Sequence, residues 1–154
     1  FRSFPYTGIH KTSWVNFMFK PVIQDEVTGC GIAAVAHILG KSYPEMKGIA
    51  NEMGIYASDK KLWSDTQYVR RLLSKEGVDS SNKEDSFTSW DELPKLALLS
   101  IKHHQEGGKN FWHWVVFRRV ENQSVVIDSA SYLDSNIRTD FESMDPKWFI
   151  EVFQ

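Results

Sequence analysis

Residues 24–40 read QDEVTGCGIAAVAHILG, and this stretch contains the first long helix that the sequence predicts. The run 30–39 (CGIAAVAHIL) is apolar around almost its whole circumference, which indicates a buried helix. Glycines lie on both sides of Cys30, and Gly40 is the residue type that most often ends a helix. We therefore expect a buried helix that begins at Cys30 and ends at Gly40.

Two further helices follow this first one. Pro44 is suited to a first helical position and Gly54 to a helix end, so they frame a second helix. Ser64 with Gln67 has the spacing of a capping box, which predicts a third helix that ends near Gly77.

The pattern changes after Pro94 from helical spacing to short β-branched and aromatic runs typical of strands. The expected strands are 96–102, 112–120, 124–128 and 148–153. A hairpin turn is expected at 121–123. Helices first and antiparallel strands later predict an α+β fold, with N-terminal helices packed on a C-terminal antiparallel sheet.

Length and composition indicate an ordinary globular domain. The 154 residues, 42% hydrophobic and 25% charged, fit a single domain over 1–154. A net charge of -2 offers no basic surface, so we expect no nucleic-acid partner, and no run is apolar enough for a membrane segment. Residues 1–23 are expected to wrap the domain. Because the chain begins at Phe1, a mature form and a piece of a larger protein both stay open.

The chain has one cysteine, Cys30, which excludes an internal disulfide and a multi-thiolate zinc site. A single thiol suits a reducing compartment, so we expect a cytoplasmic protein. His103 and His104 have no carboxylate or thiol at ligand spacing, and we expect no metal and no cofactor. Cys30 is therefore either a small core residue or a reactive group.

Cys30 lies where a nucleophilic thiol needs to be. The free N–H groups and the dipole at the start of a helix stabilise a thiolate. Gln24 lies six residues earlier, so a short loop would bring its amide beside the Cys30 N–H. Two such donors would bind the oxyanion that forms when a thiolate attacks a carbonyl.

Five histidines are candidates for the base. His37 lies seven residues along the same helix as the cysteine, about 10.5 Å away by helical rise, so it is out of reach. His10 lies in the irregular N-terminal arm, and His103 and His104 are expected to be solvated. His113 begins a strongly apolar strand, a rigid platform for a catalytic imidazole, and is the predicted base.

Asp128 is the predicted orienting group for His113, because an odd separation places both on one face of an antiparallel ladder. They are opposite each other only if the ladder centres near Val120–Glu121. A tight turn at Asn122–Gln123 would offset them by about four residues, or ~13 Å. Contact is therefore expected to need a wider hairpin or a bulge near Arg119–Val120.

Taken in chain order, these residues resemble the bacteriocin-processing cysteine peptidases. The matching features are Gln24, Cys30-Gly31 at the start of an Ala-rich helix, the strand His113-Trp-Val-Val, and Asp128-Ser-Ala. Members of that family are papain-like domains that cut leader peptides after a double glycine. The resemblance, which covers roughly residues 20–130, implies a Cys-His-Asp triad, a Gln oxyanion donor and a peptide or protein substrate.

Several alternatives remain at this point. Family members carry an acidic residue directly before the cysteine, where this chain has Gly29. An effector or toxin, or a deamidase on the same scaffold, would have the same residues. A non-catalytic peptide-binding module is another alternative, but relatives of the family that bind without cutting lack the nucleophile, so the presence of Cys30 favours the enzyme. Trp112 and Trp114 flank His113 and are expected to face the opposite side of the strand, as core or cleft wall.

Overall fold

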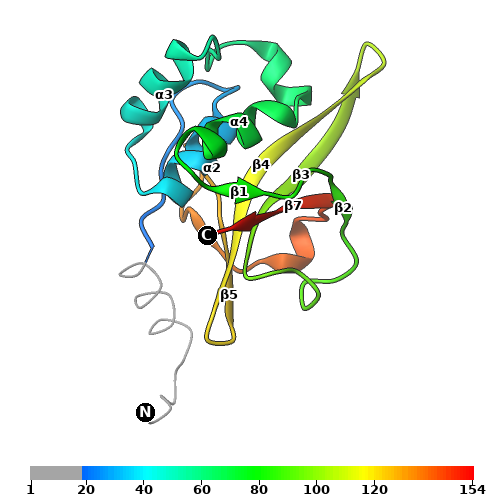
Figure 1. The fold of residues 1–154 in the computed structure, drawn as a ribbon. Coiled ribbons are helices and arrows are strands. Elements are labelled where there is room, and N and C mark those ends of the chain that lie inside the picture. The colour runs from blue at the N-terminus through cyan, green and yellow to red at the C-terminus, as the bar shows by residue number, and fades with distance from the viewer. Residues whose placement is uncertain (1–18) are drawn as a thin grey trace.

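The computed structural model describes residues 19–154, which place helices against one face of an antiparallel sheet (Figure 1). Most of the expected N-terminal arm, including His10, lies outside the described residues. Within residues 19–154 there are three α-helices and a seven-stranded antiparallel sheet, a mixed α+β fold. The helical segments are α2 (Cys30–Leu39), α3 (Tyr43–Glu52), the 3-10 turn η1 (Lys60–Ser64), α4 (Gln67–Lys75) and the 3-10 turn η2 (Phe141–Ser143).

The first helix, α2, begins at Cys30 and ends at Leu39, as the sequence predicts. Gly40 follows it with φ +70°, a left-handed conformation that glycine adopts without strain. The next helix, α3, has Pro44 in its first turn. The structure thus confirms both predicted helices.

The start of α4 differs from the predicted capping box. Ser64 belongs to the preceding η1 turn, so it cannot cap α4. Asp65 Oδ1 accepts hydrogen bonds from the backbone N–H groups of Gln67 (2.6 Å) and Tyr68 (3.3 Å) instead. A carboxylate next to the first helical turn is equally suited to accept hydrogen bonds from these free donors. The predicted helix is therefore confirmed, but the predicted Ser64 cap is wrong.

The sheet is continuous and antiparallel throughout. Its strands are β1 (Asp79–Ser80), β2 (Asp85–Ser86), β3 (Leu96–Glu106), β4 (Lys109–Val120), β5 (Gln123–Ile127), β6 (Ile137–Arg138) and β7 (Trp148–Phe153). The order is β1-β7-β3-β4-β5-β6, and β2 pairs with β7. The two long strands, β3 and β4, form its centre, and β3 carries a bulge between Ile101 and His104.

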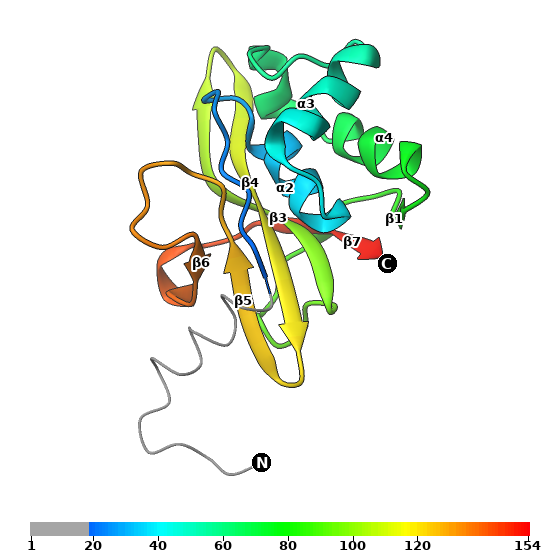
Figure 2. The ribbon, with the colours of Figure 1, turned by 90° about the vertical axis from the view of Figure 1, so that its left-hand side faces the viewer.

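Each face of the sheet carries its own hydrophobic cluster. Trp112, Trp114 and Val116 of β4 pack with the helices, whereas Val115 and Phe117 pack with η2 on the other face. Figure 2 shows the helices on one side of the sheet, and β6 with the segment that follows it on the other. The two tryptophans thus face the helices, as expected, and strand alternation turns the His113 side chain the opposite way. None of the helices in residues 19–154 is both long and apolar enough to cross a membrane.

Candidate active site

Cys30 is the first residue of α2, and its thiol meets the central strand β4. Its Sγ accepts a hydrogen bond from the backbone N–H of Trp114 at 3.4 Å, and the residue is only 1% exposed. The residue before it, Gly29, has no side chain to cap the helix. The backbone N–H groups of the first turn therefore remain available to an anion at this helix end.

The contact between α2 and β4 occurs where β5 ends. The last pair of the β4–β5 ladder is Val116 with Ile127. Hydrogen-bonded pairs alternate along an antiparallel ladder, so the Trp114 N–H points to the side that β5 has just left. The thiol of Cys30 occupies that vacated position. The end of β5 therefore decides which part of β4 the cysteine meets.

His113 and Asp128 are joined by a hydrogen bond of 2.7 Å between Nε2 and Oδ1. The expected wide hairpin or bulge is wrong: the ladder runs without a break to the pair of Val120 and Gln123. The turn lies one residue earlier than assumed. If the same register is continued by one pair beyond Ile127, Asp128 lies only two positions away from the point directly opposite His113. Such diagonal neighbours are within side-chain reach, so no irregularity is needed.

Asp128 is fully buried, at 0% exposure, and each of its carboxylate oxygens is hydrogen-bonded. Oδ1 also accepts the Ala130 backbone N–H at 3.1 Å, and Oδ2 accepts Arg138 Nη1 at 2.9 Å. Burial by itself raises the pKa of Asp128, but the hydrogen bond and charge of His113, with the hydrogen bonds from the Ala130 N–H and Arg138, outweigh it and lower the pKa below its ordinary value. Asp128 is thus a carboxylate at neutral pH.

The surroundings of His113 favour its protonated form. Burial lowers the pKa of the ring, but its interactions with Asp128 and Cys30 outweigh burial and raise the pKa to about 10. Because Nε2 is bonded to Asp128, Nδ1 is the ring nitrogen that remains for Cys30. The ring of His113 is therefore protonated at neutral pH.

The other described histidines are engaged elsewhere. His37 Nδ1 lies 3.0 Å from the Lys20 carbonyl, and its Nε2 accepts from Arg118. His104 is exposed, as expected for a solvated residue, and its Nε2 lies 3.2 Å from Glu106 Oε2. His103 is half-buried and bonded to Ser100, so the prediction that it is solvated is wrong.

Gln24 lies beside this cluster, but its amide points into its own loop. Its Nε2 donates to the backbone carbonyls of Glu26 (2.9 Å) and Val27 (3.0 Å), and its Oε1 accepts from Ser129 Oγ (2.7 Å). The Gln24 backbone N–H also bonds the Ser129 carbonyl. Gln24 therefore ties the loop before Cys30 to the segment after Asp128, and both of its amide hydrogens are in use.

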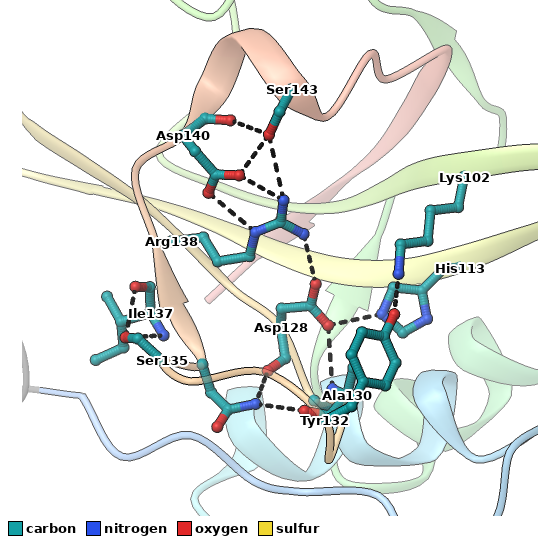
Figure 3. Close-up of polar contacts among 12 residues, drawn as sticks. Lys102, His113, Asp128, Ala130, Tyr132, Ser135, Ile137, Arg138, Asp140 and Ser143 are labelled. Carbon is teal, nitrogen blue, oxygen red and sulfur yellow. Dashed lines mark hydrogen bonds and ion pairs between the residues drawn. The ribbon is translucent and has the colours of Figure 1, made fainter.

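A cleft of about 290 Å³ opens over His113, between the loop that begins at Gln24 and the segment after Asp128. Lys102 and Tyr132 reach over it from opposite walls, and Lys102 Nζ donates to the Tyr132 hydroxyl (Figure 3). The Lys102 side chain is turned there by the bulge in β3, where its own φ is +53°. Cys30 is not among the residues that line this cleft.

Three contributors to the site escaped sequence reasoning: the Trp114 N–H, Ser129 and Arg138. The first is a backbone group, which no side-chain pattern marks. Ser129 follows Asp128 directly, and Arg138 lies ten residues beyond it in a two-residue strand too short to show any periodicity. Within residues 19–154, no group of three or more His, Cys, Asp and Glu side chains is arranged to bind a metal ion.

No protein-family model matches this chain, and no curated protein matches it. What the site does must therefore be argued from its geometry.

Proposed function

We propose that this chain is a papain-like thiol hydrolase that cleaves a peptide or amide bond. Cys30 is the nucleophile, His113 the base and Asp128 the group that orients His113. The observation that carries the proposal is the 2.7 Å bond from His113 to a fully buried Asp128, beside a cysteine that begins a helix. The resemblance to the bacteriocin-processing cysteine peptidases supports the same roles.

The proposed reaction needs only groups present in this site. His113 Nδ1 takes the proton of the Cys30 thiol, and the thiolate attacks the substrate carbonyl carbon. The oxyanion accepts a hydrogen bond from the Cys30 backbone N–H. Gln24 becomes the second donor when its Nε2 breaks its hydrogen bond with the carbonyl of Glu26 or Val27. His113 then gives its proton to the leaving amine, which leaves an acyl thioester. A water molecule deprotonated by His113 hydrolyses the thioester and restores the thiol.

A second candidate function, a non-catalytic peptide-binding module, is favoured by two observations. Cys30 is 1% exposed, whereas reactive thiols are partly accessible, and both amide hydrogens of Gln24 are already bonded. Catalysis therefore requires the Cys30 sulfur to become accessible and the Gln24 amide to release one carbonyl of its own loop. That loop is anchored by Glu26, which bonds Lys47 and the Tyr43 hydroxyl.

Alkylation separates the two candidates, because Cys30 is the only cysteine and any label reports its reactivity. Native protein and urea-unfolded protein are treated with iodoacetamide between pH 5 and 9, and the label is measured by intact mass. A hydrolase reacts well below pH 8 and faster when native than when unfolded, and His113→Ala abolishes that advantage. If native Cys30 reacts more slowly than unfolded Cys30 at every pH, the thiol is structural and the hydrolase proposal fails.

The substrate class is tested by incubating active protein with peptide libraries and whole proteins. A peptidase gives chain cleavage. A deamidase releases ammonia from glutamine or asparagine side chains and leaves the chain intact. Both products are read by mass spectrometry.

A further inference from the structure

Arg138 contacts the oxygen of Asp128 that His113 does not use. Its Nη1 donates to Asp128 Oδ2 at 2.9 Å, on the far side of the carboxylate from the His113 bond (Figure 3). The Arg138 side chain is 13% exposed and that of Asp128 is 0% exposed. This ion pair is therefore largely shielded from water.

The guanidinium of Arg138 is itself held in place. Its Nε and Nη2 donate to the two oxygens of Asp140 at 3.0 and 2.7 Å. Ser143 Oγ bonds Asp140 in turn and accepts from Arg138 Nη2 at 3.4 Å. Such a two-point bond to a carboxylate fixes the plane of a guanidinium, so its third nitrogen is aimed at Asp128. A chain of polar contacts thus runs from Ser143 to His113.

The burial of Asp128 explains why such a contact matters. An ionised carboxylate removed from water loses several kcal/mol of hydration, and without partners it becomes protonated. A protonated Asp128 would no longer stabilise the imidazolium form of His113. Its carboxyl group would also be free to rotate, since one oxygen would have lost its donor.

We propose that Arg138 is a positioning residue of the active site, which keeps Asp128 ionised and holds its Oδ1 on His113. The inference rests on the proposed hydrolase function for its catalytic consequence, but the link between Arg138 and Asp128 can be measured independently. Arg138 acts through Asp128 and does not itself touch the thiol.

Other charged or titratable groups also face Asp128 and His113. None of these residues is changed in the Arg138 and Arg70 variants compared below. They come from α2, from the loop before it, from the bulged part of β3 and from the segments on either side of β6. They are Cys30, Asp25, Glu26, Lys102, His104, Tyr132 and Asp140.

The test compares Arg138→Met with Arg138→Lys and a matched control, Arg70→Met. Arg70 is a comparably buried arginine, 11% exposed, that pairs with Glu84 away from the site. The carboxyl carbon of Asp128 is titrated by NMR in each protein. We expect the pKa of Asp128 to rise by about one to three units in Arg138→Met. The rise should be smaller in Arg138→Lys, and Arg70→Met should leave the titration unchanged.

The same proteins are alkylated with iodoacetamide across pH. We expect the acid limb of Cys30 reactivity to move upward in Arg138→Met by about one pH unit, with partial recovery in Arg138→Lys. Loss of stability alone should not move this limb, and Arg70→Met tests this expectation. Should Arg138→Met not fold, Asp140→Asn, which releases one side of the guanidinium, is expected to give a smaller shift in the same direction.

The two proposals fail in different ways. An Asp128 titration that is the same in wild type and Arg138→Met overturns the role of Arg138, whatever the activity. A wild-type thiol that reacts no faster when native than when unfolded overturns the hydrolase proposal, even if the Asp128 titration shifts as expected.

Discussion

Hydrogen bonds join the helix α2 to the strand β4 at both ends of the helix, and the histidine at each end has its pKa shifted in the opposite direction. At the N-terminal end of α2, Cys30 accepts the Trp114 N–H, and His113 lies next to it on the strand. At the C-terminal end, His37 of the helix accepts a hydrogen bond from Arg118 of the strand at 2.9 Å. Both contacts therefore join the same helix and the same strand.

The two histidines differ in the charge of their neighbours far more than in their burial. Burial lowers the pKa of both rings. Arg118 lowers the pKa of His37 further, to about 4, so His37 is neutral at physiological pH. Asp128 and Cys30 outweigh burial at His113 and raise its pKa to about 10. The comparison teaches that the neighbouring charges decide whether a buried histidine is protonated, since burial alone would leave both rings neutral.

The largest expected effect comes from removing the reacting pair. Cys30→Ala and His113→Ala should each abolish hydrolysis while leaving the fold intact, because nucleophile and base act as one unit. His37→Ala is the control from the other end of α2, and its activity per folded molecule should match wild type. Turnover of a peptide substrate and circular dichroism are the measurements. Activity in Cys30→Ala would end the hydrolase interpretation.

The next largest effect concerns Gln24, which lies near the N-terminal end of α2, where Cys30 is, and not near the His37 end. Gln24→Ala should lower kcat about hundredfold with little change in KM, because an oxyanion donor acts only in the transition state. Steady-state kinetics separate the two constants. A rise in KM with unchanged kcat would mean that Gln24 only holds its loop against Ser129.

The pH dependence of stability should show both histidines at once. The folded pKa of His113 is raised, so the native state binds more protons between about 6.5 and 10, and the free energy of unfolding falls as pH rises through this range. The folded pKa of His37 is lowered, so the free energy of unfolding falls as pH drops from 6.5 to about 4. Each slope is at most about 1.4 kcal/mol per pH unit.

Urea unfolding at a series of pH values measures these slopes. His113→Gln should flatten the alkaline side, since glutamine can still donate to Asp128 but does not titrate. His37→Gln should flatten only the acid side. If His113→Gln leaves the alkaline slope intact, His113 is not the protonated group.

The smallest effect is expected from Arg118→Met. Without this cation the pKa of His37 should rise from about 4 toward its ordinary value of 6.5. NMR titration of the His37 ring measures it, and Cys30 alkylation should not change. Arg119→Met is the control, because Arg119 bonds the carbonyls of Leu93 and Trp90 instead. An unchanged His37 pKa in Arg118→Met would leave burial as the sole cause of its neutrality.

Sequence patterns predicted the three helices and the four longer strands, but they missed β1, β2 and β6, which have two residues each and show no periodicity. Gly40 and Pro44 mark helix boundaries because few residue types suit those positions, and the structure has both boundaries as expected. His37 could be set aside as the base from helical rise alone. The cap of α4 was missed because Ser64 and Asp65 are both good N-terminal residues, and only the preceding turn decides between them.

The sequence by itself therefore determined the α+β class, the helix that begins at Cys30 and the face that His113 shares with Asp128. These features depend on local periodicity, which the order of residues contains. Only the tertiary structure decided that β5 ends at Ile127, that the Gln24 amide bonds its own loop, and that Arg138 reaches Asp128. Local periodicity does not show where a ladder stops or which of several nearby acceptors a side chain bonds, because the packing of one segment against another decides both.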